Sequence, residues 1–120
     1  MAFLKHAVEK GINQSFIKEA EQFGGRIARE VTTTQIRNIF GTIKKMEMGQ
    51  FDMSRLLLLK PRIAYAKARE RKLNELAEEL QAAIDAVEAG KDSSEQEERF
   101  VRFCQGFEAI LAYHRAAGGK

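Results

Sequence analysis

The chain has 120 residues, a length that suits one domain, and 44% of its residues are hydrophobic, enough to fill a single core. One proline, nine glycines and no tryptophan, in a sequence dominated by alanine, leucine, glutamate, lysine and arginine, favour helices over strands. No apolar run approaches the roughly 20 residues of a membrane-spanning helix, so no membrane partner is expected. The prediction is an all-α, compact single-domain bundle of about five helices over residues 1–120.

Cysteine usage and the N-terminal residues bear on the compartment. Cys104 cannot form an intrachain disulfide, and with only His6 and His114 available it has no zinc-ligand spacing. Residues 1–11 lack the apolar core and the small-residue cleavage site of a secretion signal. We therefore expect a cytoplasmic protein that holds no metal or other cofactor.

Hydrophobic periodicity and capping residues predict the first two helices. The first covers about residues 14–30 and is weakened by two adjacent glycines, while residues 1–12 before it could be a mobile arm. The second begins at Thr32 or Thr33, whose hydroxyl can accept a hydrogen bond from a free amide, and it stops at Gly49.

A third helical segment runs from Asp52 or Ser54 to about Lys72. The run Leu56–Leu59 makes its start apolar around most of the circumference, so we expect the central helix of the bundle here. Pro61 lacks an amide proton and disfavours a helical conformation in the residue before it. The segment therefore either kinks there or restarts with Pro61 in its first turn.

Two amphipathic helices complete the predicted bundle. The fourth carries apolar residues on one face from Leu73 to Val87 and ends at Gly90. Ser94 and Glu97 have the spacing of a capping box, which predicts the start of a fifth helix whose core face is rich in phenylalanine.

Charge is segregated along the chain. Residues 33–72 hold ten Lys or Arg against three acids, whereas residues 73–98 hold one Lys against nine acids. Basic residues at helical spacing could form a surface that follows a phosphate backbone, and these are Arg37, Lys44, Lys45, Arg55, Lys60, Arg62, Lys67, Arg69 and Arg71. A solvated surface paired with the acidic fourth helix would give the same pattern.

Three other residues could carry chemistry, and each has a structural interpretation. Tyr65 lies on the same side as Arg62 and Arg69, so it could stack on an unpaired base, although core packing is the commoner role. His114 stands at the edge of a core face and is interpreted as a packing histidine, with RNA contact or phosphoryl transfer as alternatives. Cys104 lies within the phenylalanine face and is expected to be buried and unreactive.

Three stretches together resemble a known family. They are residues 33–40 (TTQIRNIF), 59–66 (LKPRIAYA) and 107–114 (FEAILAYH), the last followed by two glycines. In this order they are similar to the small subunit of the type III-A CRISPR interference complex, the Csm complex. The resemblance covers about residues 32–119.

The resemblance implies a non-catalytic subunit in antiviral defence, present in several copies beside other Csm subunits, guide RNA and target RNA. It implies that the subunit stabilises target RNA through phosphate contacts, because base pairing with the guide can supply the specificity. The RNA-binding residues it implies are Arg37, Lys44, Lys60, Arg62, Lys67, Arg69 and Arg71. The alternative is a structural subunit of a helical assembly that docks on other proteins without contacting RNA.

Overall fold

The computed structural model describes residues 2–119, which form seven α-helices and one 3-10 turn and contain no strand. The elements are α1 (Phe3–Lys10), α2 (Gln14–Ile27), α3 (Thr33–Met48), α4 (Met53–Leu57), α5 (Leu59–Arg69), η1 (Arg71–Leu73), α6 (Asn74–Glu88) and α7 (Ser93–Ala116). The prediction of an all-α, single-domain bundle is confirmed. No helix within this range is both long enough and apolar enough to cross a membrane.

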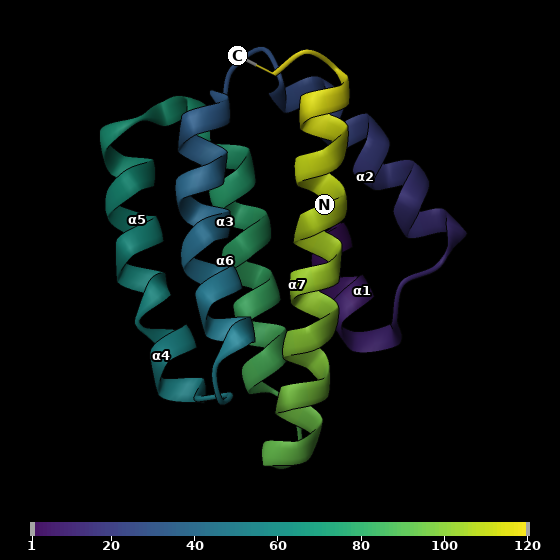
Figure 1. Cartoon of the computed structure of the whole chain (residues 1–120), viewed down its shortest axis with the longest axis vertical. Coiled ribbons are helices and arrows are strands. Elements are labelled where there is room, and N and C mark those ends of the chain that lie inside the picture. The colour runs from purple at the N-terminus through teal and green to yellow at the C-terminus, as the bar shows by residue number, and fades with distance from the viewer. Residues whose placement is uncertain (1, 120) are drawn as a thin grey trace.

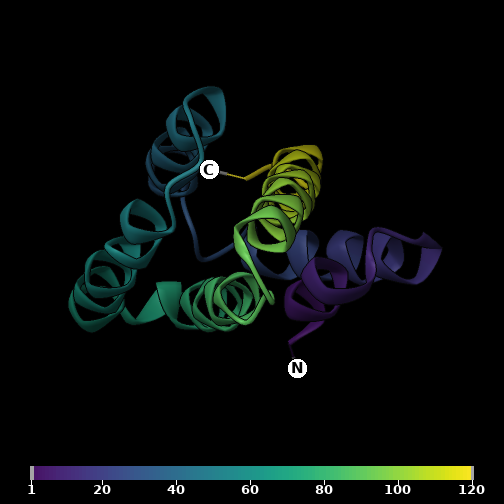
Figure 2. The same cartoon turned by 90° about the horizontal axis from the view of Figure 1, so that it is seen from below.

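Helix α7 is the central element, because α1, α2, α3 and α6 all pack against it (Figure 1). Its Phe103, Phe107 and Ile110 are fully buried. Phe107 meets Phe40 of α3 edge to face, with ring centroids 5.5 Å apart. Seen end-on in Figure 2, α3 stands opposite α6, and α1 and α2 lie on the other side of α7.

The segment from residue 52 to residue 72 is not the central helix, contrary to the sequence-based prediction. It breaks at Leu58 into two short helices, α4 and α5, and α5 packs on α6 at the side of the bundle instead of on α7. Leu56 and Leu59 are buried, whereas Leu58 is 66% exposed. Helix α5 restarts at Leu59 and holds Pro61 in its first turn, where a missing amide proton leaves no intrahelical hydrogen bond unmade.

Two glycines bring α7 close to its neighbours. A Cβ atom at Gly24 of α2 would lie 2.7 Å from Cβ of Tyr113, and a Cβ atom at Gly106 of α7 would lie 2.6 Å from Cδ1 of Leu4. At Gly24 the new Cβ would also lie within 3.0 Å of backbone atoms of Tyr113 and His114, so α7 itself would have to move, whereas at Gly106 the side chain of Leu4 would have to shift. The absence of a side chain at these positions therefore sets how closely α2 and α1 pack on α7.

Residues 3–10 form the helix α1, although the sequence allowed a mobile arm over residues 1–12. Met1 lies outside the described residues. Phe3 and Leu4 are among its buried residues, and the helix packs on α6 and α7. No side chain next to α1 in sequence caps its N-terminus. The carboxylate of Glu79, on α6, instead accepts a hydrogen bond from the Leu4 amide at 3.2 Å.

Local capping defines α3 and α7. The Thr32 hydroxyl accepts from the Gln35 amide and the Gln35 side chain accepts from the Thr32 amide, a capping box at the predicted start of α3. The predicted box at Ser94 is not formed, because α7 begins before it, where the Asp92 side chain accepts from the Glu95 amide at 2.9 Å and caps the helix. A carboxylate at this position also complements the positive end of the helix.

The C-terminal end of α7 is fastened to the start of α3. The Gly118 amide donates to the Arg115 carbonyl and the Gly119 amide donates to the His114 carbonyl, both at 3.0 Å, which is a Schellman motif. Gly118 has the positive φ of 83° that the motif requires. The Thr33 hydroxyl donates to the Gly119 carbonyl at 3.0 Å, so α3 is held at one end by the terminal turn.

The two adjacent glycines of α2 are expected to respond in opposite ways to replacement by alanine. Gly24→Ala should lower the free energy of unfolding by about 1–3 kcal/mol, because the new Cβ overlaps α7. Gly25→Ala is the matched control, since its Cβ would enter open space, and it should raise that energy by about 0.5–1 kcal/mol. Urea unfolding followed by far-ultraviolet circular dichroism measures both. Equal effects would contradict the close approach.

Glu79 is expected to make folding stability depend on pH. Burial raises the pKa of its carboxyl group, partly offset by the hydrogen bond from the Leu4 amide. The folded chain therefore keeps this proton to a higher pH than the unfolded chain, so stability falls as the pH rises from the ordinary glutamate range through the raised pKa.

Glu79→Gln should remove this fall and give a protein more stable than wild type at neutral pH, since the amide oxygen can still accept from Leu4. Glu79→Leu leaves that buried amide without an acceptor and should be less stable than Glu79→Gln by about 1–3 kcal/mol. Urea unfolding at several pH values tests this. Parallel pH profiles for wild type and Glu79→Gln would rule the effect out.

Candidate nucleic-acid interface

The cations of α5 lie on two sides of the helix. Lys60 and Lys67 face α6, where Lys60 forms an ion pair with Asp85 and Lys67 Nζ lies 3.6 Å from Glu78 Oε2. Arg62 and Arg69 are exposed and have no ion pair among the described residues. The charges of α5 are therefore partly neutralised on its inner side and unneutralised on its outer side.

Helix α3 shows a similar division. Lys44 Nζ lies 2.9 Å from Glu47 Oε1, and the hydrogen bond to this carboxylate raises the pKa of Lys44. Arg37 and Lys45 are exposed, and within residues 2–119 neither forms an ion pair. Of the seven residues predicted to bind RNA, Lys44, Lys60 and Lys67 are paired, and Arg37, Arg62, Arg69 and Arg71 are exposed and unpaired in the part of the chain that the structure describes.

Three cations from three helices meet at one shallow depression. Lys45 of α3, Arg55 of α4 and Arg62 of α5 line it, together with Thr42 and apolar side chains. We call this depression the basic hollow, and its three cations are Lys45, Arg55 and Arg62. Lys45 and Arg55 belong to the wider basic set in the sequence but not to the seven predicted residues, and the signal for Arg55 is its position two helical turns before Arg62.

The basic hollow exists because α3 and α5 are attached to different helices. Helix α3 packs on α7, whereas α5 packs on α6, and the two have little contact with each other. Between them lies an apolar cavity of about 150 Å³, lined by residues that include Ile39, Ile63 and Leu76. Arg62 lines both the cavity and the hollow, so its position marks the boundary between the apolar interior and the basic surface.

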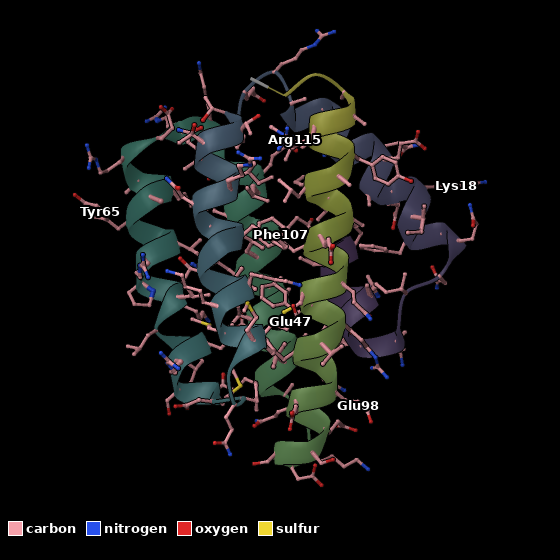
Figure 3. All side chains as sticks on the ribbon, viewed as in Figure 1. Lys18, Glu47, Tyr65, Glu98, Phe107 and Arg115 are labelled. Carbon is pink, nitrogen blue, oxygen red and sulfur yellow. The ribbon has the colours of Figure 1, made fainter. Side chains whose placement is uncertain are left out.

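Tyr65 is on the surface, so the interpretation of this residue as part of the core is wrong. Its exposed fraction is 64%, and Figure 3 shows it on the outer side of α5, pointing away from the bundle. The reason is helical spacing, because two residues turn a helix by about 200° and the preceding Ile63 is the buried one. The guanidinium carbon of Arg69 lies over the Tyr65 ring, 5.6 Å from its centroid.

His114 and Cys104, the two residues considered as nucleophiles from the sequence, are both buried. His114 is fully buried and its Nε2 lies 2.6 Å from the Val31 carbonyl oxygen, so this nitrogen donates a hydrogen bond. The packing interpretation of His114 is confirmed, and the phosphotransfer alternative is wrong because the ring is inaccessible. Burial raises the pKa of Cys104 to about 12, so its thiol stays protonated at neutral pH.

No group of three or more His, Cys, Asp or Glu among residues 2–119 is arranged to hold a metal ion.

A family model described as Csm2 Type III-A matches residues 10–120, which include all of α2 to α7. No curated protein and no solved structure matches the chain. Because the family match covers far more than half of the sequence, the chain belongs to the Csm2 Type III-A family and is a subunit of the type III-A Csm complex of CRISPR antiviral defence.

Proposed function

We propose that this Csm subunit binds target RNA paired with guide RNA through its phosphate backbone and catalyses no reaction itself. The basic hollow is the observation that carries the proposal. Lys45, Arg55 and Arg62 converge there from three helices, and no carboxylate of residues 2–119 lies within ion-pair distance of them. Unpaired cations held close together attract a polyanion more strongly than the same number of dispersed cations.

The composition of the surrounding surface supports a phosphate ligand. Helix α5 contains two lysines and two arginines and no acid, so a phosphate near the hollow meets no carboxylate on this helix. Arginine offers a planar fork of donors that matches phosphate oxygens. Contacts of this kind fix the position of an RNA strand without reading its sequence, and base pairing between guide and target supplies the specificity.

The seven predicted residues would not contribute equally. Arg62 lies in the hollow, and Arg37, Arg69 and Arg71 are exposed, unpaired cations outside it. Lys44, Lys60 and Lys67 must first give up a carboxylate partner before they can bind a phosphate. Exposed ion pairs are weak, so these lysines can still join the interface, but with a smaller net gain.

A single copy of the subunit would hold only a few phosphates. A handful of contacts gives the low affinity of non-specific binding at physiological salt. Neighbouring copies on the same RNA would add their contacts without a new loss of translational freedom, which raises the overall affinity. We therefore include other copies of this chain, with guide RNA, among the proposed partners.

Docking on another protein without RNA contact is the competing function, and two exposed apolar side chains favour it. Met48 at the end of α3 is 80% exposed and Leu58 between α4 and α5 is 66% exposed. Leu58 also lines the basic hollow. A partner protein could cover this edge of the bundle, with the hollow binding acidic side chains of that partner.

Removal of two cations from the hollow should reduce the salt dependence of RNA binding. The assembled Csm complex carrying Arg55→Gln/Arg62→Gln should lose two phosphate contacts per copy of the subunit. The slope of log affinity against log salt should then fall in magnitude by roughly 1.4 per copy for a single strand. Filter binding of labelled target RNA over a range of KCl concentrations measures the slope.

The matched control is Lys5→Gln/Lys18→Gln, which removes the same charge from exposed positions on α1 and α2 and should leave the slope unchanged. Size-exclusion chromatography shows whether each variant complex assembles. Failed assembly of the Arg55→Gln/Arg62→Gln complex would favour the protein-docking function. An intact complex with an unchanged slope would refute the phosphate contacts.

A further inference from the structure

Tyr65 is the one exposed aromatic residue within residues 2–119. All eight phenylalanines are buried or half-buried, and Tyr113 is half-buried. Tyr65, in contrast, has 64% of its surface exposed on the outer side of α5. An aromatic ring that contributes nothing to the core and lies among unpaired cations has the features of a binding site.

Three of the four helical neighbours of Tyr65 leave its ring accessible, and the fourth, Arg69, lies over one face of it. Pro61 and Ala68, one turn before and after it, are small and apolar, and Arg62 and Arg69 occupy the other two neighbouring positions. A planar group can approach the ring without steric obstruction from Pro61 or Ala68. The two arginines place positive charge on either side along the helix, where the phosphates that flank a stacked nucleoside would lie.

Arg69 keeps the ring in place before any ligand binds. Its guanidinium carbon lies 5.6 Å from the ring centroid, within the range of a cation–π interaction. A ring held in this way loses less conformational freedom on binding than a freely rotating one. From these contacts we propose that Tyr65 and Arg69 form a stacking site for an unpaired nucleobase, adjoining the phosphate contacts of the basic hollow.

The surroundings favour a base over a protein side chain. The energetically dominant aromatics of protein interfaces are enclosed by further apolar contacts that exclude water. Along the chain, the nearest large aliphatic side chain that is exposed is Leu58, seven residues before Tyr65. A base in a duplex already has its faces covered by its neighbours, so the ligand is a nucleotide outside the guide–target pairing.

The site rests on the proposed RNA binding, and intrinsic fluorescence can test the two separately. The chain has two tyrosines and no tryptophan, so Tyr113→Phe leaves Tyr65 as its single strong fluorophore. Single-stranded RNA should quench this fluorescence. An oligomer of the same length with abasic positions should bind through its phosphates, as measured by anisotropy of a labelled RNA, without quenching.

Tyr65→Ala should weaken binding of single-stranded RNA roughly tenfold and leave binding of the abasic oligomer unchanged. Tyr65→Phe is the matched control, which keeps the ring and should keep the affinity.

RNA binding without quenching, and without an effect of Tyr65→Ala, overturns the stacking site while the phosphate contacts stand. If neither RNA binds, even to the assembled Csm complex, the proposed function fails together with the site. Loss of Csm assembly with unchanged RNA affinity in Tyr65→Ala identifies a protein contact and overturns the site.

Discussion

Close packing on α7 is the constraint from which the rest of the structure follows. Four helices bury their apolar faces against it, and Gly24 and Gly106 allow the tightest of these contacts. A side chain at position 24 would push α2 away from α7, and one at position 106 would displace the buried side chain of Leu4. Helix α3 is held against α7 by the contact between Phe40 and Phe107 and by the hydrogen bond from Thr33 to the terminal turn. The positions of the exposed cations on α3 are therefore fixed by interior contacts.

The basic surface depends on a division within the bundle. Helices α3 and α5 are anchored on α7 and α6 respectively, and the basic hollow lies at the opening between them. Two acidic residues of α6 lie on the other side of α5, where Asp85 binds Lys60 and Glu78 binds Lys67. The acidic helix thus neutralises the inner cations of α5 and leaves its outer arginines available. The basic and acidic stretches of the sequence thus fold so that the paired lysines of α5 face α6 and the unpaired arginines face away from it.

Two kinds of RNA contact are proposed, and they make different physical demands. Phosphate contacts need only positive charge near the strand, which lysine and arginine at Lys45, Arg55 and Arg62 supply with little dependence on sequence. Stacking needs an accessible aromatic face in a defined orientation, which Tyr65 provides under Arg69. The first contact suits RNA in a duplex and the second suits a nucleotide that is free of it. Together they would position the subunit along paired RNA and recognise where pairing is interrupted.

The sequence by itself determined the helical class, an N-cap at Thr32 or Thr33 and the end of α3 at Gly49, because these depend on residues close together in the chain, and its motifs determined the family. Only the tertiary structure decided that α1 is a helix, since its N-terminus is capped by Glu79, 75 positions from Leu4. It also decided that α7 is central and that Tyr65 is exposed, because α5 turns the side that carries Ile63 toward the core. Which cations are unpaired was likewise decided by α6, since a carboxylate from a distant helix neutralises a lysine only after the two helices pack.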